Sequence, residues 1–179
     1  TNDFVPDDSV KLEIKSNFDR IAEKLKDSGT SLVVGMLPPK FNVYPEELPS
    51  SVRLVNSYSA AEAIDDELKT ATAFSYASPF EELLASKSTF PTYSRAYDVG
   101  HWNQFGAFIG YSTLMKAVKE QIPDLRILKE EDFSISEVGR EVRTDWGFSS
   151  TELDLNYEPK FTRTAIEDPS FFDKINYAS

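Results

Sequence analysis

Cysteine is absent from all 179 residues of the chain. Disulfide bonds, cysteine-ligated zinc sites and thiol nucleophiles are therefore excluded, and the absence is compatible with export from a bacterium. Histidine is nearly absent as well, because His101 is the only one. A single histidine with scattered carboxylates gives no recognisable set of metal ligands. We expect neither a metal site nor a cofactor.

Long apolar runs are also missing, since none approaches the roughly 18–20 residues that span a bilayer. No secretory hydrophobic region is found, and we expect no direct insertion into a membrane. Basic residues are in the minority, because 30 acidic residues against 19 basic ones give a net charge of −11. Such a charge opposes binding to phosphate backbones, so nucleic acid is not an expected partner.

Aromatic residues, by contrast, are plentiful: the chain has 13 Phe, 8 Tyr and 2 Trp, and 40% of its residues are hydrophobic. This composition is typical of a folded chain and not of a disordered one. A length of 179 residues is enough for a sizeable core and favours a single domain over residues 1–179.

The first part of the chain predicts helix followed by strand. A helix should begin after Ser9, a plausible N-cap, and end near Gly29. Its apolar face would consist of Ile14, Phe18, Ile21 and Leu25. The apolar run 31–37 predicts a buried strand that stops at Pro38. This order favours layered α/β structure.

Four prolines between residues 38 and 51 argue against regular structure, and we expect an ordered loop there. Further helices are expected over residues 57–71, over residues 78–88 with Ser78 as cap, and from Asn103 to Pro123. Further strands are expected over residues 70–77, 92–99 and 125–128. The last third has no clear periodicity.

The stretch YDVGHWNQFGAF, residues 97–108, places Asp98 three residues before His101. On a tight loop, the carboxylate can fold back to the imidazole Nδ1 and leave Nε2 facing outward as a base. A strand, loop and helix in this order would put the pair at the carboxyl edge of a sheet, where α/β proteins bind ligands. The alternative is a packed or capping histidine.

Two stretches carry a family resemblance: LPPKFNVYPEELP, residues 37–49, and YSRAYDVGHWNQFGAFIGYSTLMKAV, residues 93–118. They resemble the SGNH-hydrolase-like proteins of the alginate O-acetyltransferase (AlgX and AlgJ) and DHHW group. The resemblance implies a three-layer α/β/α sandwich, SGNH-hydrolase-like or flavodoxin-like. Its sheet would be mostly parallel, its strand order circularly permuted, and the fold incomplete at the C-terminus.

The resemblance also implies a Ser-His-Asp triad that moves acetyl groups on or off a polysaccharide. His101 would be the general base and Asp98 its orienting acid, while Trp102 and Asn103 would line or cap the site. The location would be extracellular or in the bacterial cell envelope, and a membrane-bound acyltransferase would be a possible partner.

The chain departs from the family pattern in two respects. The acetyltransferases place Asp two residues before His, where this chain has Val99, whereas Asp98 and His101 fit the Asp-x-x-His of the wider SGNH hydrolases. No Gly-Asp-Ser nucleophile turn occurs, and Ser9, Ser28 and Ser149 are poor substitutes. We expect the nucleophile beyond the chain end. The alternative is a non-catalytic glycan-binding or scaffold domain of the same fold.

The proline-rich stretch supplies two further candidates for substrate binding. Lys40 could bind an acidic sugar, or it could pair with Glu46 or Glu47, an exposed contact of little energetic value. The ring of Tyr44 could stack on a sugar, or it could anchor the loop to the core.

Overall fold

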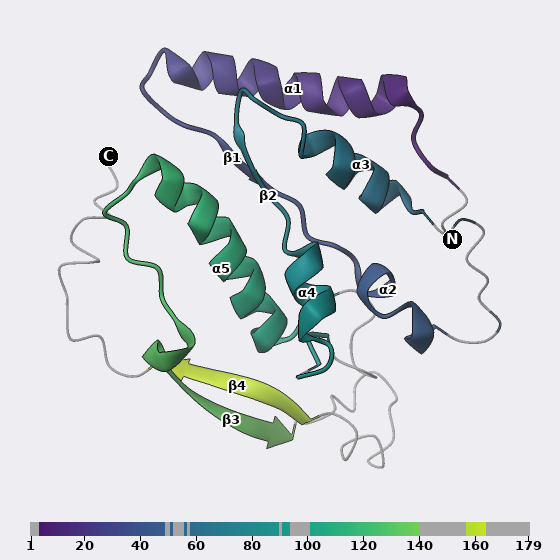
Figure 1. Ribbon diagram of the computed structural model, residues 1–179, viewed down its shortest axis with the longest axis vertical. Coiled ribbons are helices and arrows are strands. Elements are labelled where there is room, and N and C mark those ends of the chain that lie inside the picture. The colour runs from purple at the N-terminus through teal and green to yellow at the C-terminus, as the bar shows by residue number, and fades with distance from the viewer. Residues whose placement is uncertain are drawn as a thin grey trace, which may run out of the picture.

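The structure is a computed structural model that describes residues 4–48, 51, 56, 58–89, 91–93, 101–139 and 157–163. Figure 1 shows how its elements are arranged. The helices are α1 Asp8–Lys26, α2 Lys40–Val43, η1 Pro45–Glu47, α3 Ala60–Leu68, α4 Phe80–Ser86, α5 Gln104–Gln121 and η2 Glu130–Asp132. The strands are β1 Val33–Gly35, β2 Ser75–Ala77, β3 Phe133–Gly139 and β4 Tyr157–Arg163.

The centre of the fold is a parallel pair of strands covered on both faces. β1 and β2 pair in register with Val34 opposite Tyr76. Helices α1 and α3 lie on one side of this pair and α5 on the other (Figure 1). The described residues therefore form three layers, α/β/α, as the sequence predicts, with β1 and β2 as the middle layer.

The side chains of the strands alternate between the two layers of helices. One face contributes to an apolar cluster centred on Ala22 of α1, Leu68 of α3 and Phe74 just before β2. The partly buried members of this cluster are Ile14, Phe18, Leu32, Val34, Ile64, Ala71 and Tyr76. We call this group the sheet core. Its α1 members include Ile14 and Phe18 of the expected apolar face, but Ala22 is buried in place of Ile21, which is 45% exposed. Residues three and four apart still share this side of the helix.

Helix α5 runs antiparallel to the strands on the opposite face. Near its end, the Gln121 amide nitrogen donates to Ser75 Oγ at 3.0 Å, and the amide oxygen accepts from Ser31 Oγ at 3.3 Å. These serines stand at or before the starts of the strands. The beginning of α5 therefore lies at the carboxyl ends of β1 and β2, where α2 and α4 also lie (Figure 1).

Two helix starts differ from the expected ones. The N-cap of α1 is Asp7, not Ser9, because the Asp7 carboxylate accepts from Val10 N at 3.0 Å and also from Ser9 Oγ at 2.6 Å. A carboxylate at this position is further favoured by the positive end of the helix dipole. Helix α4 begins at Phe80, with Pro79 in the cap position and no side-chain cap, so the expected cap Ser78 is wrong.

The proline-rich stretch is more regular than expected, because it forms α2 and η1. Pro39 is the N-cap of α2, and Pro45 is the first residue of η1. Proline is tolerated there because the first N–H groups of a helix lack intrahelical partners. The prolines therefore start two short helical turns within the segment.

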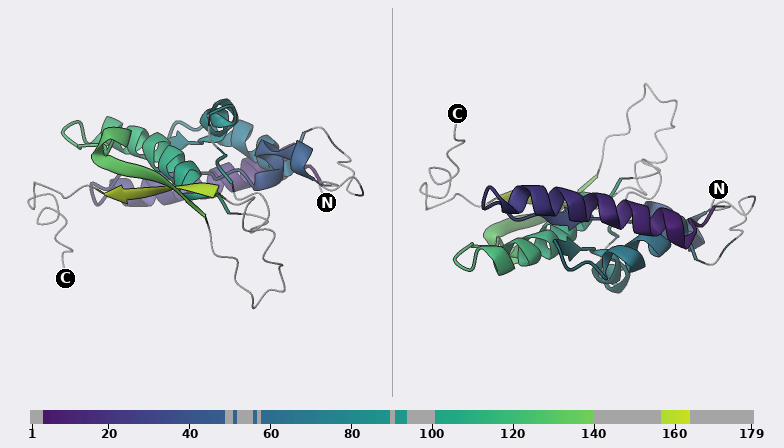
Figure 2. Two further views of the ribbon diagram at one scale, coloured as in Figure 1. Left: turned by 90° about the horizontal axis from the view of Figure 1, so that it is seen from below. Right: turned by 90° about the horizontal axis from the view of Figure 1, so that it is seen from above.

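The expected strand over residues 125–128 is absent from the described part of the chain, where these residues follow a turn in an irregular conformation. Leu128 N donates to the hydroxyl of Tyr111 on α5 at 3.1 Å, so a side chain and not a strand satisfies it. Beyond it, β3 and β4 form a separate antiparallel pair against α5, which the sequence did not predict (Figure 2).

Candidate functional site

The loop that carries His101 is fixed at its base. Tyr93 and Trp102 form an isolated antiparallel bridge. Asn103 N donates to Thr92 O at 2.9 Å, and Asn103 Nδ2 donates to Pro91 O at 2.6 Å. These contacts hold residues 91–93 against residues 102–103 at the base of the loop, and we call this pairing the neck. Asp98 lies outside the described residues, and so do residues 94–99 of the expected strand.

Asn103 is the N-cap of α5, as the sequence predicts. Its Oδ1 accepts from Gly106 N at 3.0 Å, and the residue is only 4% exposed. Both polar groups of the side chain are therefore used within the fold, one for the helix and one for the neck. This arrangement orients the first turn of α5 relative to the loop.

The two glycines of α5 explain how the neck approaches the helix. A Cβ on Gly106 would overlap Thr92 O and lie 2.8 Å from Trp102 Cβ, and a Cβ on Gly110 would overlap the Trp102 ring. Residues four apart share one face of a helix. Because neither position has a side chain, the half-buried indole of Trp102 can pack directly against α5.

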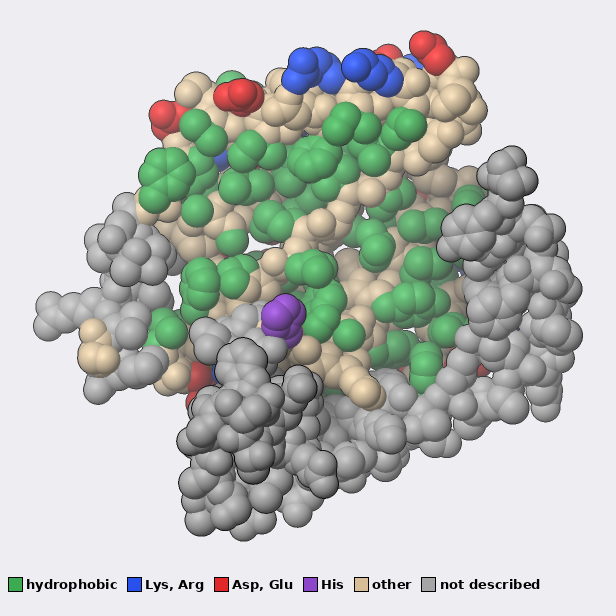
Figure 3. All heavy atoms as spheres, turned by 180° about the vertical axis from the view of Figure 1, so that it is seen from behind, with side chains coloured by type: hydrophobic (Ala, Val, Ile, Leu, Met, Phe, Trp, Pro, Cys, Tyr) green, Lys and Arg blue, Asp and Glu red, His purple; other side chains and the backbone are tan. Residues whose placement is uncertain are grey.

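His101 itself lies at the surface, next to Trp102 and two residues before Asn103, the cap of α5. In Figure 3, its side chain is accessible among apolar side chains on one face of the molecule. The helix start places it at the carboxyl edge of the β1–β2 pair. An imidazole in this position can meet a substrate from solvent, as a general base must.

The two stretches that carry the family resemblance meet here, directly through Tyr93 and Pro38 and also through Thr92, the residue before the second stretch. Thr92 N donates to Tyr44 Oη at 3.0 Å, and Tyr44 Oη lies 3.1 Å from Thr92 Oγ1. Tyr93 Oη donates to Pro38 O. Burial and the nearby Tyr44 raise the pKa of Tyr93 to about 12, so this hydroxyl remains a donor near neutral pH. We call the meeting of residues 38–48, 91–93 and 101–110 the loop junction.

Lys87, just after α4, holds the other side of the loop junction. Its Nζ donates to Val43 O at 2.7 Å, pairs with Glu46 Oε1 at 2.6 Å and lies 4.7 Å from the ring centroid of Tyr44. The hydrogen bond from Lys87 lowers the pKa of Glu46. One of the two acids considered as partners of Lys40 is thus bonded to Lys87.

Lys40 and Tyr44, the two candidates for substrate binding from the proline-rich stretch, are both partly buried in the fold. Lys40 is the first residue of α2 and is partly buried. Tyr44 has its hydroxyl on Thr92, Lys87 near its ring, and the ring of Tyr93 at 5.9 Å in an edge-on contact. This geometry favours the anchoring interpretation of Tyr44 over stacking on a sugar.

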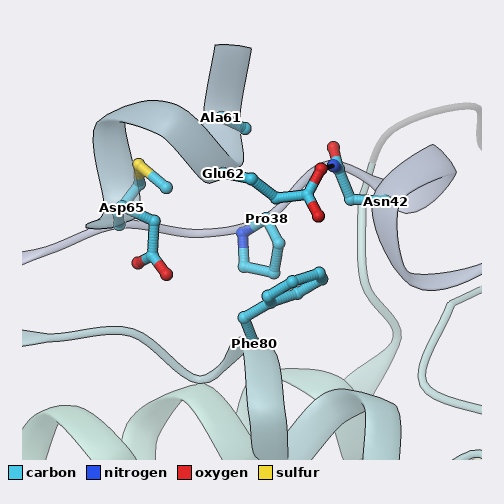
Figure 4. A pocket seen from close by; sticks show the side chains of 7 residues that line it. Pro38, Asn42, Ala61, Glu62, Asp65 and Phe80 are labelled. Atoms are coloured by element: carbon cyan, nitrogen blue, oxygen red, sulfur yellow. Dashed lines mark hydrogen bonds between the residues drawn. The ribbon is translucent and has the colours of Figure 1, made fainter. Parts of the chain in front are cut away.

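A small cavity separates the loop junction from α3 (Figure 4). Asn42 of α2 points toward Glu62 of α3 and donates to Glu62 Oε2 at 3.1 Å and to Ser59 Oγ at 2.6 Å. The volume of about 10 Å³ has room for about one water molecule. It is lined by Met36, Pro38, Asn42, Ala61, Glu62, Asp65 and Phe80. A cavity of this size cannot bind a sugar.

Asp65, in the wall of that cavity, is a buried structural carboxylate. It accepts from Tyr76 Oη at 2.6 Å, and its other oxygen lies 2.6 Å from Lys69 Nζ. Burial acts to raise the pKa of Asp65, but the hydrogen bonds from Lys69 and Tyr76 outweigh it, so the pKa is lowered. The group is therefore ionised near neutral pH and stabilises the packing of α3 on β2.

A larger, open depression of about 280 Å³ lies along α5 and the segment before β3. Its lining is mostly apolar and aromatic: Gln104, Ala107, Phe108, Tyr111, Leu128 and Phe133. Gln104 is three residues after His101, so the depression begins near the loop. Among the described residues, no three His, Cys, Asp or Glu side chains gather as a metal site requires.

A family comparison identifies the fold. The model of the SGNH hydrolase-like domain of the acetyltransferase AlgX matches residues 8–158. The chain belongs to this family. The match includes both stretches of the loop junction, so the resemblance expected from them is confirmed. No curated protein matches the chain.

Solved structures share the AlgX-family fold at low identity. PatB1 of Bacillus cereus is 15% identical, with a TM-score of 0.61 over 88% of this chain and 53% of its own. PatB1 with a sulfonyl adduct is 16% identical, with a TM-score of 0.60 over 86% of this chain and 48% of its own. The O-acetyltransferase domain of Pseudomonas putida AlgJ is 17% identical, with a TM-score of 0.52 over 90% and 59%. The chain spans about half the length of these structures.

Sequence reasoning missed Thr92 and Lys87, which tie the loop junction together. Both residues lie within expected elements, the strand over residues 92–99 and the helix over residues 78–88, but no spacing points to their partners Tyr44 and Val43, which are more than forty residues away. Gly106 and Gly110, four residues apart on an expected helix, were the available signal for a close approach. In the described part of the chain, no helix is long and apolar enough to cross a membrane.

Proposed function

We propose that the complete protein containing this AlgX-family chain is an SGNH-type carbohydrate O-acetyltransferase or acetylesterase, with residues 1–179 within its SGNH-like domain. His101 acts as general base and Asp98 holds its Nδ1. The observation that carries the proposal is the exposed His101 beside a neck pinned by Thr92 and Asn103, because a base must be both accessible and held in place.

The proposed reaction has two steps and needs no cofactor. A serine outside this chain attacks the acetyl carbonyl carbon while His101 Nε2 takes the hydroxyl proton, and His101 then returns that proton to the departing alcohol. In the second step, water or a sugar hydroxyl gives its proton to His101 and attacks the acetyl-serine. The acetyl group leaves on the acceptor, and the proton returns to the serine.

The proposed setting follows from the resemblance. The substrate is a polysaccharide, and the protein works outside the cell or in the bacterial envelope. A membrane-bound acyltransferase partner would supply acetyl groups if the protein is a transferase. Trp102, Asn103 and Lys40 remain predictions as substrate-contacting residues, and so does Tyr44, whose contacts favour the anchoring interpretation instead.

The test uses the complete protein and a small acetyl ester, para-nitrophenyl acetate. We expect His101→Ala to lower turnover by about three orders of magnitude or more, since the members of a triad act as a unit. Asp98→Asn should lower it as well. Intact-mass spectrometry after treatment with a sulfonyl fluoride should show one adduct, formed more slowly in His101→Ala. Near-wild-type turnover in His101→Ala would refute the assignment.

The alternative is a non-catalytic glycan-binding or scaffold domain. The lack of Gly-Asp-Ser in these 179 residues favours it for this chain taken alone. It predicts binding of a polysaccharide by the complete protein with no release of acetate and no acetyl-serine in the mass spectrum. Detection of an acetyl-serine intermediate would exclude it.

A further inference from the structure

We propose that Tyr44 is a positioning residue that fixes the loop of His101 through the neck at Thr92. The inference rests on the proposed function for its effect on turnover, but its geometric basis is separate. Tyr44 lies 48 residues before Thr92 in the chain, and its hydroxyl meets both the backbone nitrogen and the side chain of Thr92.

The contact is at a place that water cannot easily reach. Thr92 is fully buried, with 0% of its surface exposed. Its N–H donates to Tyr44 Oη at 3.0 Å, and its Oγ1 lies 3.1 Å from the same oxygen. Removal of the Tyr44 hydroxyl would leave both groups of Thr92 without this partner in a dry environment. The expected response is a shift of the Thr92 backbone toward another partner.

A shift of Thr92 would be passed to His101 through the neck. The carbonyl of Thr92 accepts from Asn103 N at 2.9 Å, and the next residue, Tyr93, bridges Trp102. His101 is covalently attached to Trp102. Consecutive Cα atoms are ~3.8 Å apart, so a shift of this bridge also moves the backbone that carries the imidazole.

Tyr44 is itself held by contacts that do not involve the His101 loop. Lys87 Nζ lies 4.7 Å from its ring centroid, and Val43, its neighbour in the chain, is 0% exposed. Lys87 also bonds Val43 O and Glu46. These contacts hold the Tyr44 ring in place, so its hydroxyl has a fixed position. A group that positions another residue must itself be held in this way.

The experiment compares two variants of the complete protein that remove the same atom. Tyr44→Phe removes the hydroxyl that meets Thr92, and Tyr76→Phe removes the hydroxyl that donates to buried Asp65 at 2.6 Å in the sheet core. Both changes leave a buried polar group without its partner. With para-nitrophenyl acetate, Tyr44→Phe should lower kcat by about 10- to 100-fold and change KM by less than about twofold, because misplacement of a base slows chemistry. Tyr76→Phe should leave both nearly unchanged.

A second readout does not depend on activity. The imidazole resonance of His101 is assigned by its loss in His101→Ala, and it should move or broaden in Tyr44→Phe but not in Tyr76→Phe. Thr92→Val is the milder variant if Tyr44→Phe fails to fold, because it keeps the N–H bond, and Thr92→Ser should retain the wild-type spectrum. An unchanged His101 resonance in the folded Tyr44 or Thr92→Val variant overturns the inference.

The two proposals fail in different ways. Full turnover in His101→Ala would remove the proposed function, and the resonance of His101 would still decide whether Tyr44 positions it. A dead His101→Ala variant together with a Tyr44→Phe variant that behaves like Tyr76→Phe would overturn the positioning role and leave the proposed function intact.

Discussion

The sheet core and the loop junction are stabilised in different ways, although they lie in the same fold. The sheet core joins apolar side chains at helical and strand spacing, with Phe18 and Phe74 rings 5.7 Å apart. The loop junction depends on single atoms: the Tyr44 hydroxyl, the Asn103 amide and the missing Cβ of Gly106. The sheet core should therefore respond mainly to volume that is lost, whereas the loop junction, which also packs against an apolar cluster of Val43, Leu83 and Tyr93, should respond to volume that is gained as well.

The largest expected effect is on the sheet core. Phe74 is 7% exposed and lies at the centre of the apolar cluster. Phe74→Ala should lower the free energy of unfolding by about 3–5 kcal/mol, because it removes buried apolar surface and leaves a cavity. The measurement is a guanidinium titration of the complete protein. Well below the unfolding midpoint, turnover of para-nitrophenyl acetate should stay within about twofold of wild type, because the change lies outside the loop junction.

The difference between the sheet core and the loop junction would be contradicted if Phe74→Ala, measured while fully folded, reduced turnover as much as Tyr44→Phe. That result would mean that the sheet core and the loop junction respond as one unit. Leu83→Ala on α4 is the counterpart beside the loop junction, since Leu83 is 0% exposed and packs with Val43 and Tyr93 of the junction. It should cost about 2–5 kcal/mol and, unlike Phe74→Ala, also reduce turnover.

A smaller effect comes from adding one methyl group in each region. Gly106→Ala should cost about 1–3 kcal/mol or more, because the new Cβ overlaps the Thr92 carbonyl, and backbone cannot rotate away as a side chain can. Gly35→Ala is the matched control: its Cβ would lie 3.3 Å from Leu114 Cδ1, the end of a flexible side chain. We expect that control to change stability by less than about 1 kcal/mol in either direction.

Both glycine variants should be measured by guanidinium unfolding and by turnover. Gly106→Ala should lower kcat together with stability, since it pushes the neck away from α5. Equal free energies of unfolding for Gly106→Ala and Gly35→Ala would contradict the close packing of Thr92 on the helix.

The contrast also explains how much could be predicted from sequence. Apolar spacing identified α1, α5 and the strand positions of β1 and β2, because burial on one face forces residues to recur at the period of the element. Asn103 was identified as a cap because its chemistry is local. The family resemblance identified both stretches of the loop junction.

The remaining features depend on contacts between distant segments. One exception is local: Ser9 was predicted as the cap, but the helix begins earlier, with Asp7 bonded to Val10 N and the Ser9 hydroxyl donating to the Asp7 carboxylate. The link from Tyr44 to Thr92 spans 48 residues and involves one hydroxyl, so no spacing rule signals it. The β3–β4 pair was missed because its β-forming residues are interspersed with polar ones in a long polar stretch, and because β4 includes Pro159, a residue that disfavours strands. Apolar spacing was predictable, helix caps were predictable only in part, and tertiary hydrogen bonds were not.

The smallest effects distinguish two ion pairs: Asp65–Lys69, which is linked to the sheet core through Tyr76, and Glu46–Lys87 at the loop junction. Asp65 is 2% exposed and bonds Lys69 and Tyr76, whereas the Glu46 side chain is 54% exposed and bonds Lys87. Asp65→Asn should cost about 1–3 kcal/mol, since buried partners lose charge-assisted bonds. Glu46→Gln should cost at most about 1 kcal/mol, because solvent and salt screen an exposed pair.

The pH dependence of stability gives the sharper discrimination. The pKa of each carboxyl is lowered in the folded protein, that of Asp65 by hydrogen bonds that outweigh burial and that of Glu46 by the hydrogen bond from Lys87. Each group therefore stabilises the fold above its unfolded pKa, near 4, and loses that contribution as the pH falls through its folded pKa. Urea titrations between about pH 2 and pH 7 should show a shallower acid decline in Asp65→Asn than in wild type. With added salt, the dependence of stability on pH in Glu46→Gln should become the same as in wild type. In Asp65→Asn, this dependence should still differ from wild type. If added salt also made the pH dependence of Asp65→Asn the same as that of wild type, the Asp65 carboxylate would be as well solvated as Glu46.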